Sequence, residues 1–71
     1  MIEARDLINR MKTYDPQVNE DLISRAYDYG KKMHEPQKRA SGDPYFTHPL
    51  EVAQIIIDMK LDAASVCTAM L

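Results

Sequence analysis

The chain contains two histidines, and the second lies in a sequence context that could support chemistry. His48 follows a loop-forming run, Gly42-Asp43-Pro44, and immediately precedes Pro49. Imidazole changes its protonation near neutral pH and is the commonest metal ligand in proteins, so His48 is a candidate metal ligand or acid–base group. A single histidine does not make a metal site, because divalent ions prefer several nitrogen and oxygen ligands.

The residues around His48 predict where it lies. Glycine and proline mark the preceding segment as a loop. Pro49 suits the first turn of a helix, where its missing N–H has no intrahelical partner to lose. We therefore expect His48 at the N-cap boundary of a helix that begins at Pro49. The alternative is a capping or solvated histidine without a chemical role, and position alone does not decide between the two.

A basic segment precedes this loop. Lys31, Lys32, Lys38 and Arg39 stand against one acid, Glu35, which gives a local net charge of +3 (four cations minus one anion) in a chain whose net charge is −2. Lysine and arginine bind phosphate oxygens well, so the segment could bind a phosphate-rich ligand. The alternative is a solvated helix end, where the helix dipole favours cations.

The composition limits the class of protein. Seventy-one residues allow one domain, and 45% hydrophobic with 28% charged residues is typical of a globular protein. No apolar run approaches the roughly 20 residues needed to cross a membrane. The acidic net charge gives no reason to expect direct nucleic-acid binding. The single Cys67 excludes an internal disulfide and fits a reducing cytoplasm, which is the expected location.

Apolar residues recur at helical spacing and predict an all-α protein of about four helices. The first covers about residues 3–14 and is broken by Asp15-Pro16. The second is expected to begin at a cap provided by Asn19 or Asp15, and Pro36 stops it. Its predicted apolar stripe consists of Leu22, Ile23, Ala26, Tyr27, Gly30, Met33 and His34.

Two residues of this stripe carry specific expectations. Gly30 costs a helix about 1 kcal/mol relative to alanine, so we expect a neighbouring element to pack closely against it. A histidine on an apolar face is more often a core residue hydrogen-bonded to a neighbouring loop than a ligand. We therefore expect His34 to be structural.

The last two helices are strongly apolar. The third, about residues 49–59, has apolar residues on more than one face and three consecutive isoleucines, so we expect a central, mostly buried helix. A turn at Lys60-Leu61 follows, and Asp62 is the expected N-cap of a fourth helix from Ala63. That apolar helix reaches Leu71 without a cap, which indicates a piece of a larger domain. The apolar faces of both helices predict self-association.

One long pattern consists of Ala26-Tyr27, His34-Glu35-Pro36-Gln37-Lys38-Arg39-Ala40-Ser41-Gly42-Asp43-Pro44-Tyr45, His48-Pro49-Leu50, Val52-Ala53 and Ile56. It resembles the N-terminal hydrolase domain of the RelA/SpoT family, enzymes that make and degrade guanosine tetra- and pentaphosphate, (p)ppGpp. The resemblance covers nearly the whole chain from about Tyr14 and implies an all-α fold of HD type. In the family, a His-Asp pair follows a helix that ends like residues 68–71, so residues 1–71 are expected to end just before that pair.

The resemblance implies roles for individual residues. His48 matches the first ligand of the family's metal, usually Mn²⁺. Arg39 matches a residue that packs against the guanine base, and Ser41 one that contacts it. Tyr45 would shape the pocket wall beside His48. Ala40 stands where some members carry a lysine, which removes one basic contact to the nucleotide.

The resemblance also implies a reaction, the metal-dependent hydrolysis of the 3′-pyrophosphate of (p)ppGpp. The remaining metal ligands and the acidic pair that assists catalysis would lie beyond residue 71, so we expect no catalytic residue within the chain and no activity of the chain alone. Two alternatives stay open: a regulatory pseudo-hydrolase domain that has lost its metal ligands, and a helical interaction module without a catalytic role.

Overall fold

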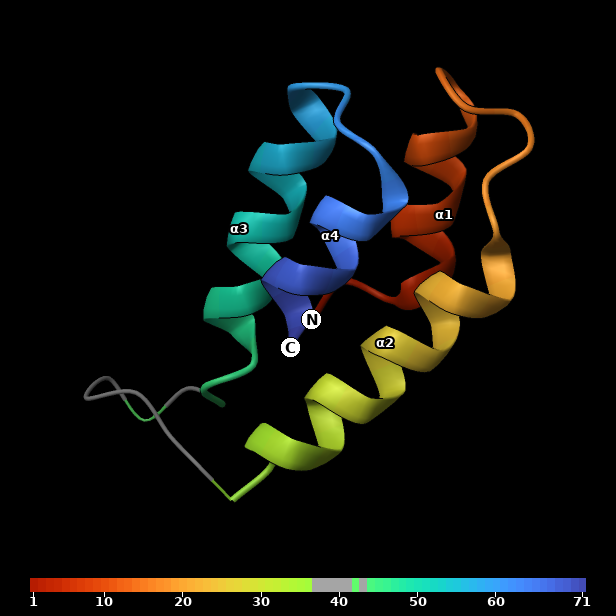
Figure 1. Ribbon diagram of the computed structural model, residues 1–71. Coiled ribbons are helices and arrows are strands. Elements are labelled where there is room, and N and C mark those ends of the chain that lie inside the picture. Colours follow the sequence, from red (N-terminus) through yellow and green to blue (C-terminus); the bar gives the residue numbers. More distant parts are fainter. Residues whose placement is uncertain (37–41, 43) are drawn as a thin grey trace.

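The computed structural model describes residues 1–36, 42 and 44–71, and these form four α-helices and no strand (Figure 1). The helices are α1 (Ala4–Lys12), α2 (Glu20–His34), α3 (Thr47–Asp58) and α4 (Ala63–Met70). Helix α4 packs against α2 and α3, and α1 packs against the same two helices. The predicted all-α fold of four helices is confirmed. No described helix is both long enough and apolar enough to cross a membrane.

Local side-chain hydrogen bonds explain where three of the helices begin. The side chain of Asn19 accepts a hydrogen bond from the backbone N–H of Leu22 at 3.0 Å, and Asp62 accepts one from Ser65 at 2.9 Å. Asp62 was the predicted N-cap of its helix, and Asn19 was one of two candidates beside Asp15. The hydrogen bond from Ser65 lowers the pKa of Asp62. Helix α1 begins with a capping box, in which the backbone N–H of Glu3 donates to the Asp6 side chain.

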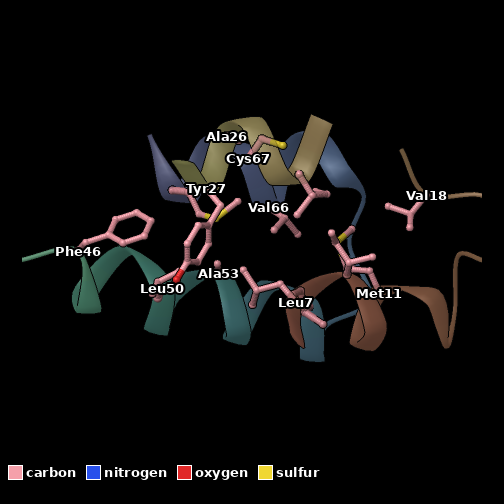
Figure 2. Close-up of a cluster of buried hydrophobic side chains, with 14 residues drawn as sticks. Leu7, Met11, Val18, Ala26, Tyr27, Phe46, Leu50, Ala53, Val66 and Cys67 are labelled. Carbon is pink, nitrogen blue, oxygen red and sulfur yellow. The ribbon is translucent and has the colours of Figure 1, made fainter. Parts of the chain in front are cut away.

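The core draws on all four helices and on the segments between them. Figure 2 shows its side chains meeting between α1 and α3 on one side and α2 and α4 on the other. The hydroxyl of Tyr27 reaches out of this core and donates to the carbonyl of Ile2 at 2.5 Å. Burial is the main cause that raises the pKa of this hydroxyl. The buried apolar residues are Leu7, Ile8, Met11, Val18, Ile23, Ala26, Tyr27, Phe46, Leu50, Ala53, Ile57, Val66, Cys67 and Met70.

Helices α2 and α4 touch at Gly30, as the sequence predicted. A Cβ atom at this position would lie 2.2 Å from the carbonyl oxygen of Met70 and 2.9 Å from Cε1 of Phe46. Backbone atoms cannot move aside as the end of a flexible side chain can. Only glycine therefore permits this approach, and the end of α4 depends on it.

The prediction that the third helix is mostly buried was wrong. Its buried face is narrow, whereas Ile55 is 59% exposed and Met59 is 63% exposed. The physical reason is that the backbones of only two helices, α1 and α4, pack closely against α3, whereas the backbone of α2 stays further away. The residues of the buried face are Pro49, Leu50, Ala53 and Ile57.

The apolar stripe of α2 is likewise narrower than predicted. Ile23, Ala26, Tyr27 and Gly30 are buried, but Leu22 is 41% exposed and Met33 is 56% exposed. Helix α4 covers only part of this side of α2. It leaves a surface hollow of about 320 Å³, whose lining is Leu22, Arg25, Ala26, Tyr29, Cys67 and Leu71.

The connection between α3 and α4 is a left-handed helix ending. Lys60 has a φ of 59°, its backbone N–H donates to Ile57, and that of Leu61 donates to Ile56. This pair of hydrogen bonds is the Schellman motif, in which glycine usually occupies the left-handed position. The predicted turn at Lys60-Leu61 is confirmed, with a strained residue at its centre.

Ion pairs join α1 to α2 and α3. Glu20 on α2 pairs with Arg5 at 2.9 Å and with Lys12 at 2.5 Å, and Arg10 pairs with Asp58. The hydrogen bonds to Glu20 from Lys12 and then Arg5 lower the pKa of that carboxyl. All of these side chains are substantially exposed, so the pairs orient α1 more than they stabilise it.

Candidate functional site

The turn over residues 44–48 is held by short-range hydrogen bonds and leads directly into α3. The backbone N–H and the hydroxyl of Thr47 both donate to the carbonyl of Pro44, at 3.1 and 2.8 Å. The N–H of His48 donates to the carbonyl of Tyr45 at 3.0 Å, and that of Leu50 donates to Phe46 at 3.1 Å. The backbone of both predicted site residues, Tyr45 and His48, is therefore ordered by the start of the helix.

His48 is exposed in the first turn of α3, where it is the second residue of the helix, two positions further in than the predicted N-cap. Helix α3 begins at Thr47 instead of Pro49, because Phe46 already has helical dihedrals (φ −60°, ψ −19°) and serves as the N-cap. Pro49 still lies in the first turn, where its missing N–H costs nothing. The prediction of an N-cap position for His48 was wrong, and the prediction of a helix mouth beside a loop was right.

Three rings lie side by side at this helix mouth. The ring centroids of Tyr45 and His48 are 6.3 Å apart, with an interplanar angle of 59°. The ring of Tyr45 also lies near that of His34, at a centroid distance of 5.1 Å and an interplanar angle of 40°. The structure therefore places Tyr45 next to His48, as expected for a pocket wall. It also adds His34, a half-buried residue at the end of α2 that the sequence placed among structural residues.

Phe46 connects these rings to the core, and sequence reasoning missed it. It is 1% exposed and meets Tyr27 edge-on, at 5.2 Å and 82°. Its ring is also nearly parallel to that of His34, at 6.4 Å and 18°. One feature of the sequence could have identified it: the chain has a single phenylalanine, and it lies between a loop and an apolar helix. A large apolar residue there packs back onto the core and fixes the angle at which the helix begins.

The two predicted base-contacting residues, Arg39 and Ser41, lie outside the described residues, as does Lys38. Their roles stay predictions. Of the basic segment, the structure describes Lys31 and Lys32, which are exposed in the last turns of α2.

The sequence profile of the HD domain family matches residues 26–71, which contain α3, α4 and most of α2. The matched part also contains His34, Tyr45 and His48. The chain therefore belongs to the HD domain family.

Similar proteins place the chain more narrowly. It is 52% identical over all 71 residues to the GTP pyrophosphokinase rsh of Brucella melitensis and 50% identical over 58 residues, 82% of the chain, to the GTP pyrophosphokinase of Myxococcus xanthus. It is 46% identical over 50 residues, 70% of the chain, to the "Probable guanosine-3′,5′-bis(diphosphate) 3′-pyrophosphohydrolase" of Mycoplasma pneumoniae. These similarities confirm the predicted RelA/SpoT resemblance. The chain spans 10%, 8% and 7% of these three proteins, respectively. No solved structure matches it.

HD domains are generally metal-dependent, and the described residues include one candidate metal ligand, His48. His48 offers one exposed imidazole, a donor that fits a divalent metal. Within residues 1–36, 42 and 44–71, no three His, Cys, Asp or Glu side chains are grouped so as to hold an ion. The imidazole of His48 is thus one donor of the kind that a divalent metal binds, and a complete ligand set is not found among these residues.

Proposed function

We propose that the chain is the N-terminal part of an HD-type hydrolase domain that removes the 3′-pyrophosphate from (p)ppGpp, and that the rest of the domain lies in a longer protein. The observation that carries the proposal is the placement of His48. It is an exposed imidazole on an ordered helix mouth, in a chain half identical to enzymes named for guanosine phosphate chemistry. We also propose a cytoplasmic location.

In the proposed reaction, the oxygen of a water molecule adds to the phosphorus attached to the ribose 3′-oxygen. The bond between that phosphorus and the 3′-oxygen breaks, the 3′-oxygen gains a proton, and pyrophosphate leaves. A bound divalent metal, which we propose to be Mn²⁺, lowers the pKa of its water and stabilises charge on phosphate oxygens. His48 would hold this metal together with ligands from outside the chain.

The nucleotide would be bound on the loop side of His48. Arg39 would stack its guanidinium on the guanine base and Ser41 would contact the base, while Tyr45 would line the pocket between them and His48. A planar guanidinium suits stacking on a purine. Tyr45 is 37% exposed, so part of its ring is accessible to a ligand.

The 71-residue chain alone should bind Mn²⁺ weakly and should not hydrolyse (p)ppGpp. One imidazole is fewer donors than a hard divalent ion requires. Calorimetric titration with Mn²⁺ is expected to give no stoichiometric submicromolar site. Such a site in the monomeric chain would show that the ligand set is already complete and would overturn this part of the proposal.

We further propose that the isolated chain self-associates through its exposed apolar side chains. Leu22, Tyr29 and Leu71 lie around the hollow between α2 and α4, and Ile55 and Met59 lie on the open face of α3. Contiguous apolar surface of this kind is typical of contact sites. Sedimentation velocity is expected to show association that increases with concentration. A strictly monomeric profile with a cooperative thermal melt would contradict it.

A chimera tests the proposed activity. The 50 matched residues of the Mycoplasma pneumoniae relative are replaced by the corresponding residues of this chain, and pyrophosphate release from ppGpp is measured with Mn²⁺ in excess. The chimera is expected to retain the release measured for the unmodified host. A folded chimera that releases none, beside an active host, would contradict the proposal.

The same chimera separates substrate binding from catalysis. Arg39→Ala is expected to raise KM about 5- to 30-fold with little change in kcat, because a stacking contact worth roughly 1–2 kcal/mol is similar in ground and transition states. Arg25→Ala, which removes an exposed arginine paired with Asp21 on α2, is the matched control and should change neither constant. A collapse of kcat in Arg39→Ala would contradict the base-stacking role.

A further inference from the structure

We infer that His34 is a positioning residue for His48 and acts through the ring of Tyr45, which is a ring neighbour of both imidazoles. The inference deepens the proposed function, since the proposed metal ligation by His48 gives the positioning its purpose. The contacts themselves do not depend on a metal or a substrate.

The innermost ring of this series, that of Phe46, is buried in the core. Phe46 is 1% exposed and Tyr27 is 3% exposed, and their rings meet edge-on at 5.2 Å. Phe46 also lies within 2.9 Å of the place where a Cβ of Gly30 would stand. A ring held by the core and by the backbone of α2 cannot shift without disturbing the crossing of α2 and α4.

His34 is the next ring outward. The imidazole of His34 is nearly parallel to the ring of Phe46, with an interplanar angle of 18° and a centroid distance of 6.4 Å. His34 is the last residue of α2, whereas Tyr45 lies in the following turn and His48 in α3. His34 is therefore a contact from α2 to Tyr45, in addition to the contacts that Tyr27 and Gly30 make with Phe46.

In the inferred arrangement, His34 orients Tyr45. Tyr45 is 37% exposed, and the centroid of its ring lies 5.1 Å from that of His34. The centroid of the His48 ring lies 6.3 Å from that of Tyr45. Both separations fall within the range of about 4.5–7 Å in which aromatic pairs attract one another.

Hydrogen bonds fix the backbone around His48, so only its side-chain dihedral angles can change. The N–H of His48 donates to the carbonyl of Tyr45 at 3.0 Å, and Thr47 donates twice to Pro44. Residues three apart in a helical turn lie on the same side of the helix. The ring of Tyr45 therefore limits the rotamers of His48, and removal of His34 would free first the ring of Tyr45 and then the imidazole of His48.

The test uses nuclear Overhauser effects between the ring protons of Tyr45 and His48 in the 71-residue chain, without metal or substrate. The wild type is expected to show these cross-peaks. His34→Ala should lose most of their intensity while the amide shifts of α1 and α4 stay in place. His34→Phe, which keeps a flat ring, should restore them. Tyr29→Ala, which removes an exposed ring elsewhere on α2, should leave them unchanged.

Unchanged cross-peaks in a folded His34→Ala variant would overturn the inference. If that variant does not fold, His34→Leu fills the volume without a flat ring and serves the same comparison; retained cross-peaks in it would equally overturn the inference. A second expectation concerns the chimera carrying His34→Leu. The Mn²⁺ concentration that gives half-maximal pyrophosphate release should rise about tenfold, because substituting a residue that orients a metal ligand typically weakens metal binding by this factor or more.

The cross-peaks and the pyrophosphate release test two separate claims. If the cross-peaks disappear in His34→Ala but the wild-type chimera releases no pyrophosphate, the positioning stands and the proposed function falls. If the chimera is active but the cross-peaks persist in His34→Ala, the proposed function stands and His34 is not the positioning residue.

Discussion

The crossing of α2 and α4 at Gly30 and the helix mouth at residues 44–48 are built on different principles. At the crossing, the backbone of α4 approaches so closely that a single added carbon would lie 2.2 Å from the carbonyl oxygen of Met70. At the helix mouth, Tyr45 and His48 are exposed, and a series of ring contacts links them through His34 to the buried Phe46.

The difference separates stability from function. The crossing is complete within the described residues, because both surfaces of the contact come from α2 and α4. The helix mouth offers one imidazole and an accessible ring, which become useful only with further ligands and a substrate. Changes at the crossing should therefore reduce the free energy of unfolding, and changes at the helix mouth should affect binding and catalysis. Phe46 belongs to both regions and is the first place to test the distinction.

Phe46→Ala is expected to have the largest effect, lowering the free energy of unfolding by about 3–5 kcal/mol, since a fully buried aromatic side chain is lost. Urea unfolding followed by circular dichroism measures it. Tyr45→Ala is the matched control one residue earlier and should cost much less. If both variants lost similar stability, the separation between core and helix mouth would be wrong.

Gly30→Ala should come next, with a loss of about 1–3 kcal/mol from overpacking. The expected sign is informative, because alanine favours a helix by about 1 kcal/mol over glycine. Lys32→Ala, an exposed position on the same helix, should be nearly neutral. A Gly30→Ala variant more stable than the wild type would mean that the two helices can separate without cost.

Lys60→Gly is expected to stabilise the chain by about 0.5–1 kcal/mol, since glycine removes the strain of the left-handed φ of 59° at the end of α3. The connection leads into α4, so the gain should appear in the unfolding midpoint and leave the Tyr45–His48 cross-peaks unchanged. Lys12→Gly, inside α1, should instead destabilise. A loss of stability in Lys60→Gly would contradict the observed helix ending.

The N-cap of α4 should give the smallest effect, visible as a pH dependence. The hydrogen bond from Ser65 lowers the pKa of Asp62 in the folded chain, so its contribution is present above the unfolded pKa of about 3.9 and is lost as pH falls through the folded value. Asp62→Ala should melt at a lower temperature than the wild type at pH 7. The difference should shrink below about pH 4, and a constant difference down to pH 2 would contradict the capping role.

Local rules predicted much of the crossing from the sequence. A glycine in an apolar stripe indicated close approach, and side-chain caps at Asn19 and Asp62 need only their own helix, so all three expectations are confirmed. The exposure of Ile55 and Met59 was mispredicted, because an apolar pattern shows which faces could be buried but not how many neighbours are present to bury them.

The helix mouth was predictable only in part. The resemblance pointed to His48 and Tyr45 together, and the structure brings their rings to 6.3 Å. The parts played by Phe46 and His34 depend on contacts between the end of α2 and the turn before α3, which no periodic pattern records. Arg39 and Ser41 lie outside the described residues, so their roles rest on the resemblance.

The claim that His48 supplies a metal ligand is tested most directly by pyrophosphate release from ppGpp in the chimera carrying His48→Ala, with Mn²⁺ in excess. Loss of a ligand removes the activated water, so we expect kcat to fall to background while Tyr29→Ala keeps the rate of the parent chimera. A His48→Ala chimera that retained a substantial part of the parent kcat would contradict the account.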